Sequence, residues 1–142
     1  MSVSLKKLNF FVLIISYTGS TLTAQSFNRQ DTLRGSVTPE RAWWDLLHYE
    51  LNVKVDPAKK YISGSNTIRY KVLESSKRIQ IDLQDPLMIT KVIQDGQKLG
   101  FKKDGFAYFI DLEKSQETGD INELIIEYEG LPLESINPPW SG

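Results

Sequence analysis

The feature that most constrains this chain is an alternation of apolar and polar residues, repeated in short segments between turns. In residues 49–55 the apolar side chains Tyr49, Leu51, Val53 and Val55 are separated by single polar residues, and an Asp-Pro pair follows. Successive side chains of a strand point to opposite faces of its sheet. The segment is therefore predicted to be a strand with one buried face.

The same alternation recurs along the chain. Asp95-Gly96 and Asp104-Gly105 stand between alternating runs and predict hairpin turns. Gly64, inside a strand-like run, predicts a bulge or a close approach of two backbones. No segment is a convincing helix, and the stretch "ERAWWDLLHY" is interpreted as a lead-in to the first strand. The predicted strands are HYELNVKV, YISGSNTIRYKV, RIQIDL, LMITKVIQ, QKLGFKK, FAYFIDLEK and INELIIEYE.

This pattern predicts an all-β fold, a mainly antiparallel β-sandwich or curved, saddle-like sheet. The apolar strand at 121–130 is followed by a proline-bearing tail, which cannot supply a full ladder of hydrogen bonds. We therefore expect the fold to be incomplete at its C-terminal end. An exposed strand edge and an apolar patch are expected there.

The first residues have the order of an export signal. Lys6 and Lys7 precede the apolar run Leu8–Tyr17, and small and polar residues lead to Ala24. Residues 1–24 are predicted to be a secretory signal peptide, because the apolar run is too short to span a bilayer. A short membrane anchor or a buried helix is the alternative. Residues 25–39 are predicted to be a flexible tail and residues 40–142 a β-sandwich domain, exported to the periplasm or secreted, with no stable membrane anchor after cleavage.

Composition excludes several function classes. The formal net charge is −1 and no run of basic residues occurs, so nucleic acid is not an expected partner. The chain has no cysteine and one histidine. These counts leave no thiolate metal site or disulfide framework, and they remove nearly every zinc or Ser-His-Asp arrangement.

Candidate site residues are few, and none forms a convincing site. His48 lies near Asp45 and Glu50, but a metal site would need more ligands, so we interpret His48 as a structural or surface residue. Five carboxylates could pair as a general acid and base, although alternating polar faces produce such pairs by default. We therefore predict no catalytic, cofactor-binding or metal-binding residue. The five carboxylates are those of Asp82, Asp85, Asp111, Glu127 and Glu129.

Trp43 and Trp44, with Tyr49 nearby, allow two interpretations. Exposed on a flat face, the indole rings could stack on a sugar. Buried, they would fill one end of the sandwich. Their exposure separates these alternatives.

An ordered series of short stretches resembles a known family. The series includes His48-Tyr49, the run Val53-Lys54-Val55-Asp56, and Gly64-Ser65. It continues through "IQIDLQDPLMI", "VIQDGQKLGF", "AYFIDL", "LIIEYEGLP" and "NPPWSG". From about residue 38 to residue 142 the chain is similar to the N-terminal domain of the aminopeptidase N family of zinc metallopeptidases (gluzincins), and most similar to the exported bacterial branch.

The resemblance implies a saddle-like β domain that supports a catalytic domain. In the family that later domain carries an H-E-x-x-H helix and a distant Glu as zinc ligands, and a G-x-M-E-N stretch for the substrate amine. None of these occurs in this sequence, so no site residue is carried over and zinc belongs to the complete family enzyme. The chain is expected to be a fragment, truncated inside the domain and before the catalytic part.

Two functions follow from these observations. The first is a non-catalytic portion of an exported zinc-dependent aminopeptidase, a peptide hydrolase. Its expected partner is the catalytic domain, which alone would contact peptides, and the chain as it stands is expected to have no enzymatic activity. The alternative is a stand-alone exported β-sandwich that binds glycan or protein.

Overall fold

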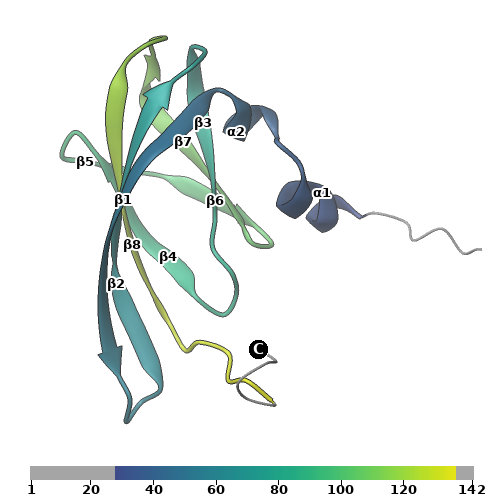
Figure 1. The fold of residues 1–142 in the computed structure, drawn as a ribbon, viewed down its shortest axis with the longest axis vertical. Coiled ribbons are helices and arrows are strands. Elements are labelled where there is room, and N and C mark those ends of the chain that lie inside the picture. The colour runs from purple at the N-terminus through teal and green to yellow at the C-terminus, as the bar shows by residue number, and fades with distance from the viewer. Residues whose placement is uncertain (1–27, 137–142) are drawn as a thin grey trace, which may run out of the picture.

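Eight strands and two short helices form residues 28–136, the part of the chain that this computed structural model describes (Figure 1). The predicted signal peptide and the "NPPWSG" segment after Ile136 lie outside these residues. The helices are α1 (Arg29–Gly35) and α2 (Pro39–Ala42). The strands are β1 (Trp44–Asp56), β2 (Tyr61–Val72), β3 (Ser76–Asp82), β4 (Met88–Gln94), β5 (Gln97–Leu99), β6 (Phe101–Asp104), β7 (Ala107–Gln116) and β8 (Ile121–Gly130).

The strands form two antiparallel sheets. The first has the order β1-β2-β8-β4-β5, and the second has the order β3-β7-β6. The predicted all-β sandwich is confirmed. The predicted open edge at residues 121–130 is wrong, because β8 lies between β2 and β4 and is paired on both sides.

One predicted strand is two strands. Residues 97–103 divide at Gly100 into β5 and β6, which belong to different sheets. Leu99 is buried in the core, and the Phe101 ring packs against Tyr108 with 5.7 Å between ring centroids. The chain therefore crosses between the sheets at a residue without a side chain. Both Asp-Gly turns are confirmed as hairpins, and Asp95 and Gly96 both have the positive φ that a type I′ turn requires.

The chain before β1 is more ordered than the sequence indicates. Residues 29–35 were expected to lie in a flexible tail without a helix, yet the structure places α1 there. Asn28 begins the helix with a capping box, in which its side chain accepts from the Asp31 N–H and Asp31 accepts from the Asn28 N–H. Leu33 is buried against Ala107 and Phe109.

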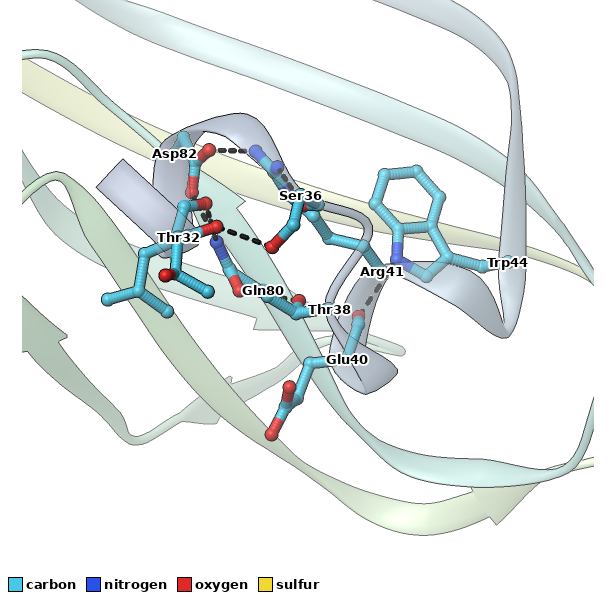
Figure 2. A network of polar contacts seen from close by, with 9 residues as sticks. Thr32, Ser36, Thr38, Glu40, Arg41, Trp44, Gln80 and Asp82 are labelled. Atoms are coloured by element: carbon cyan, nitrogen blue, oxygen red, sulfur yellow. Dashed lines mark hydrogen bonds and ion pairs between the residues drawn. The ribbon is translucent and has the colours of Figure 1, made fainter. Parts of the chain in front are cut away.

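Buried polar contacts tie this N-terminal segment to β3 (Figure 2). The Thr38 hydroxyl donates to Gln80 Oε1 at 2.7 Å, and Gln80 Nε2 donates to the Leu33 carbonyl at 3.2 Å and to Asp82 Oδ1 at 2.8 Å. Arg41 forms an ion pair with Asp82. Gln80 is 1% exposed, so the loss of these bonds would leave a buried amide unpaired.

The core between the sheets is centred on Tyr70. Trp43 and Trp44 approach its ring edge-on, with centroids 5.9 Å and 5.8 Å away. Their indole N–H groups donate to the carbonyls of Arg78 and Glu40. Trp43 is 3% exposed. The two indoles therefore fill one end of the sandwich, and Trp43 does not lie on the flat exposed face that a sugar-stacking role requires.

The first prediction concerns the Tyr70 hydroxyl. Burial, the main cause, raises the pKa of Tyr70 to about 12, while the hydrogen bond from Gln94 lowers it and the charge of Asp95 raises it. Because the folded pKa exceeds the unfolded value, the stabilisation is complete below about pH 10 and is lost between about pH 10 and 12. Between pH 10 and 12 the free energy of unfolding should fall by roughly 2 kcal/mol less in Tyr70→Phe than in the natural protein, because the variant has no hydroxyl to ionise at this position. Urea unfolding of both proteins at several pH values measures this difference. Equal pH dependence of the free energy of unfolding in the two proteins would contradict the prediction.

Candidate interaction surface

One face of the five-stranded sheet extends beyond the second sheet. Strand β1 has 13 residues and β2 has 12, whereas β3 has seven. At about 3.3 Å per residue, β1 spans about 43 Å and β3 about 23 Å. Figure 1 shows the lower parts of β1 and β2 running past the strands of the second sheet. Part of the inner face is therefore left without a cover from the described residues.

Strand register shows that the uncovered part belongs to the core side of the sheet. Tyr49 lies opposite the buried Ile68, and Leu51, Val53 and Val55 follow at every second residue along β1. Leu51, Val53 and Val55 are 61%, 50% and 62% exposed. The predicted alternation in this strand is confirmed, but the expectation that its apolar face is buried is wrong for the described residues. We define the open inner face as the residues of β1, β2 and β8 that lie on this side of the sheet beyond Ile68, without the buried Ile126: Leu51, Val53, Val55, Ile62, Gly64, Asn66 and Tyr128.

A groove of about 350 Å³ lies where the open inner face meets the end of the second sheet. Leu51, Val53 and Ile62 line one side, and Ile81 and Leu83 line the other. Its one charged lining residue, Asp82, is bonded to Arg41 and Gln80. The groove is thus an apolar site that suits another apolar segment.

Gly64 is required at the floor of this face. A Cβ at residue 64 would lie 2.0 Å from the Asn52 carbonyl oxygen and 3.0 Å from the Tyr128 hydroxyl. Tyr128, opposite Gly64 on β8, reaches across it and donates to the Asn52 carbonyl at 3.4 Å. The close approach predicted from Gly64 is confirmed, and it makes the face flat at this point.

Asn66 gives the apolar groove one polar atom. Its side-chain oxygen is buried and has no hydrogen-bond partner among the described residues. Buried polar groups are normally bonded. This oxygen is therefore left unsatisfied among the described residues, and it is shielded from a segment that lies over the groove.

The residues considered from the sequence as catalytic candidates do not come together. His48 lies on the outer face of β1, opposite Arg69. Four of the five carboxylates pair with separate cations, which accounts for their charge without an acid and base pair. These pairs are Asp82–Arg41, Asp85–Lys103 at 2.5 Å, Asp111–Arg78 at 3.6 Å and Glu127–Lys91 at 3.1 Å.

The perturbed charged groups have structural causes. The hydrogen bond to Asp85 is the main reason that the pKa of Lys103 is raised. The hydrogen bond from Arg29, followed by that from Gln30, lowers the pKa of Asp104, despite some desolvation. Both Arg29 and Gln30 belong to α1, so this carboxylate holds the helix against the β6–β7 turn.

Two further kinds of feature bear on the function of the described residues, clusters of metal ligands and helices long enough to span a bilayer. No three His, Cys, Asp or Glu side chains in residues 28–136 gather in a way that could hold a metal ion. Neither of the described helices has the length and apolar character needed to cross a bilayer.

A second cavity, of about 410 Å³, lies at the Asp95 turn and is polar. Gln116 Oε1 accepts from Asn122 Nδ2 at 2.6 Å and from the Tyr70 hydroxyl at 3.4 Å, and Gln94 Nε2 donates to that hydroxyl at 2.9 Å. These amides satisfy one another. The cluster was not expected from the sequence, because its members lie in four separate strands or turns.

Known structures share this fold. A crystal structure of the M1 zinc metallopeptidase from Deinococcus radiodurans matches 68% of this chain with a TM-score of 0.58 and 23% sequence identity. A two-domain M1 zinc metallopeptidase variant bound to L-tryptophan matches 70% of the chain, with a TM-score of 0.59 and 23% sequence identity. Native yeast LTA4 hydrolase matches 61% of the chain, with a TM-score of 0.52 and 28% sequence identity. No protein-family model and no curated protein sequence matches the chain.

These matches confirm the resemblance to M1 zinc metallopeptidases at the level of the fold. The chain spans only 22%, 23% and 14% of these three proteins, in the order in which they are named above. The activity of those whole proteins therefore belongs to the proposal below.

The second prediction compares two positions on one sheet face. Val53→Lys should change the free energy of unfolding by less than about 0.5 kcal/mol, because Val53 is half exposed. Ile68→Ala should cost about 2–5 kcal/mol, because Ile68 is 1% exposed beneath the second sheet. Urea denaturation of both variants measures the difference. Equal costs would show that the face near Val53 is covered.

Proposed function

We propose that this chain is a non-catalytic N-terminal β-domain portion of an exported zinc-dependent aminopeptidase. Its role is to support the catalytic domain that removes N-terminal residues from peptides. The fold shared with M1 metallopeptidases supports the family assignment. The observation that carries the supporting role is the open inner face, an apolar surface continuous with the core and free of cover from the described residues.

The energetics favour a packed partner for this face. Full burial of a Val, Leu or Ile side chain is worth about 1.5–3 kcal/mol. Leu51, Val53 and Val55 are each at least half exposed. A segment that covers them would therefore gain part of this free energy from each of the three side chains.

No step of peptide hydrolysis is assigned to this chain. In the complete family enzyme zinc lowers the pKa of a bound water and polarises the peptide carbonyl. The donor set in residues 28–136 does not fit that ion, because no cluster of three possible ligands forms there. The contribution of the chain is therefore mechanical, through a preformed apolar surface beside a rigid two-sheet core.

The third prediction tests the family role through the coding DNA after codon 142, read in all three frames. We expect it to encode a G-x-M-E-N stretch and an H-E-x-x-H helix. The extended protein should then hydrolyse an aminoacyl chromogenic substrate, and a chelator should abolish the activity. The present chain alone should give none. Chelator-sensitive hydrolysis by this chain, or an unrelated gene after codon 142, would overturn the proposal.

Paired variants in the extended protein test the open inner face. Val53→Lys should lower the thermal midpoint and the activity there, although it is nearly neutral in the present chain. Lys102→Glu, an exposed residue on the other sheet, serves as the control and should leave both unchanged. If Val53→Lys has no effect in the extended protein, this face is not the support.

The glycan-binding alternative has little support. It requires both tryptophans on a flat exposed face, whereas Trp43 is buried and both indole N–H groups are bonded to backbone carbonyls.

Export yields the fourth prediction. Expressed in a bacterium with its own first 24 residues, the chain should be recovered outside the cytoplasm and begin at Gln25. Mass spectrometry of the intact protein measures the cleavage, and replacement of Ile14 and Ile15 by Asp within the apolar run should block it. Recovery of the uncleaved chain from the membrane fraction would instead favour an anchor.

A further inference from the structure

Strand β1 has one edge to which no described strand pairs. It is the first strand in the order β1-β2-β8-β4-β5, and its 13 residues make it much longer than β5 at the other end. A register shift between Leu46 and His48 interrupts the strand near its start, and Pro57 follows its last residue, Asp56. The regular free edge is therefore residues 48–56, which are centred on Asn52.

The backbone groups of this edge alternate in direction. The Asn52 carbonyl points toward β2, since it lies beside Gly64 and accepts from Tyr128 beyond it. In an antiparallel strand, neighbouring residues direct their N–H and C=O groups to opposite sides. The N–H and C=O groups of Leu51 and Val53 therefore point to the free edge, and so do those of Tyr49 and Val55. Unpaired edges of this length are ready templates for another strand.

The outer face of the segment is complementary to itself. Its side chains, in order, are His48, Glu50, Asn52, Lys54 and Asp56. If the segment pairs antiparallel with an identical segment about a two-fold axis at Asn52, Glu50 lies opposite Lys54 of the second copy and Lys54 lies opposite its Glu50. His48 then lies opposite Asp56. A shift by two residues brings like charges closer or leaves the pairs unmatched.

The charges at this edge have no ion-pair partner among the described residues of their own chain. On β2, Thr67 lies opposite Glu50 and Ser63 lies opposite Lys54. Neither Glu50 nor Lys54 forms an ion pair within residues 28–136. Asp56 is paired with Lys59 at 3.4 Å, so it contributes less. Opposite charges directly across a strand pair stabilise it, and like charges destabilise it.

We propose that the free edge of β1 pairs with a second copy of this chain, antiparallel and centred on Asn52. The same register places Leu51 beside Val53 of the second copy, and Tyr49 beside Val55. The apolar rows of the two inner faces thereby join into one surface across a continuous ten-stranded sheet. This contact uses the strand edge and is independent of the proposed support of a catalytic domain, which uses the inner face.

A charge exchange tests the pairing in the full chain. Analytical ultracentrifugation at about 100 μM should show a dimer, a concentration at which a micromolar complex is largely formed. Glu50→Lys and Lys54→Glu should each raise the dissociation constant about tenfold or more, because both symmetry-related pairs become repulsive. The double variant should restore the dimer. Lys102→Glu, the same change on the short edge strand β6, should have no effect.

Introduced thiols test the register, because the natural chain has no cysteine. Asn52→Cys should give a disulfide-linked dimer on mild oxidation, since residue 52 lies about 4.5 Å from its symmetry mate between Cα atoms, as in a pair that makes no ladder bonds. His48→Cys should not, because eight residues at about 3.3 Å separate the two thiols in this register.

Three results would overturn the proposal. The first is a chain that stays monomeric at this concentration. The second is a dimer that tolerates both single charge reversals. The third is equal cross-linking from positions 48 and 52, which would show that the copies meet without this register. Far-ultraviolet circular dichroism of each variant establishes that it is folded before these comparisons are made.

Discussion

The structure depends on a mismatch in length between its two sheets. A sandwich buries its inner faces only where both sheets are present, and here β1 and β2 have 13 and 12 residues against seven in β3. Ile68 and Val53 belong to the same face, yet one is at the core and the other is half exposed. The second sheet is also narrower, with three strands against five, and Tyr49 on the edge strand β1 is 49% exposed although it lies opposite the buried Ile68. The apolar groove and the open inner face therefore follow from a second sheet that is both shorter and narrower than the first.

The N-terminal segment strengthens the end of the sandwich that is covered. Gln80 lies in β3 and bonds to Thr38 and to the Leu33 carbonyl, while Asp104 holds Arg29 and Gln30 of α1. Gly105 leaves room for this contact, because a Cβ there would lie 1.7 Å from Gln30 Oε1. The molecule therefore has a consolidated end at α1, α2 and the tryptophans, and an open end at the lower part of β1. Any partner of the apolar face meets a surface whose support is already rigid.

The sequence predicts the strands better than their surroundings. Alternation shows that Leu51, Val53 and Val55 share a face, but it cannot show whether another sheet covers that face, which depends on the length of β3. Asp95-Gly96 predicts its hairpin because the required backbone conformation is local. Helix α1 is only seven residues long, too short for a periodic signal, and its stability comes from Asn28 and from contacts with β6 and β7. The crossing at Gly100 and the central place of β8 are properties of long-range pairing. The groove and its Asn66 oxygen could not be predicted from the sequence, because they depend on how the two sheets pack together.

The central position of β8 has a consequence for how the chain acquires its structure. Strand β2 pairs with β1 through a short turn, but its other neighbour ends at Gly130, so Ile62 meets a residue 68 positions later. Until β8 has been synthesised, the β1–β2 ribbon and the β4–β5 hairpin have no strand to join them. Contacts of such large sequence separation are slow to form, because a long loop must be closed first. A newly made chain would thus hold its two local hairpins unjoined until residue 130 has been synthesised.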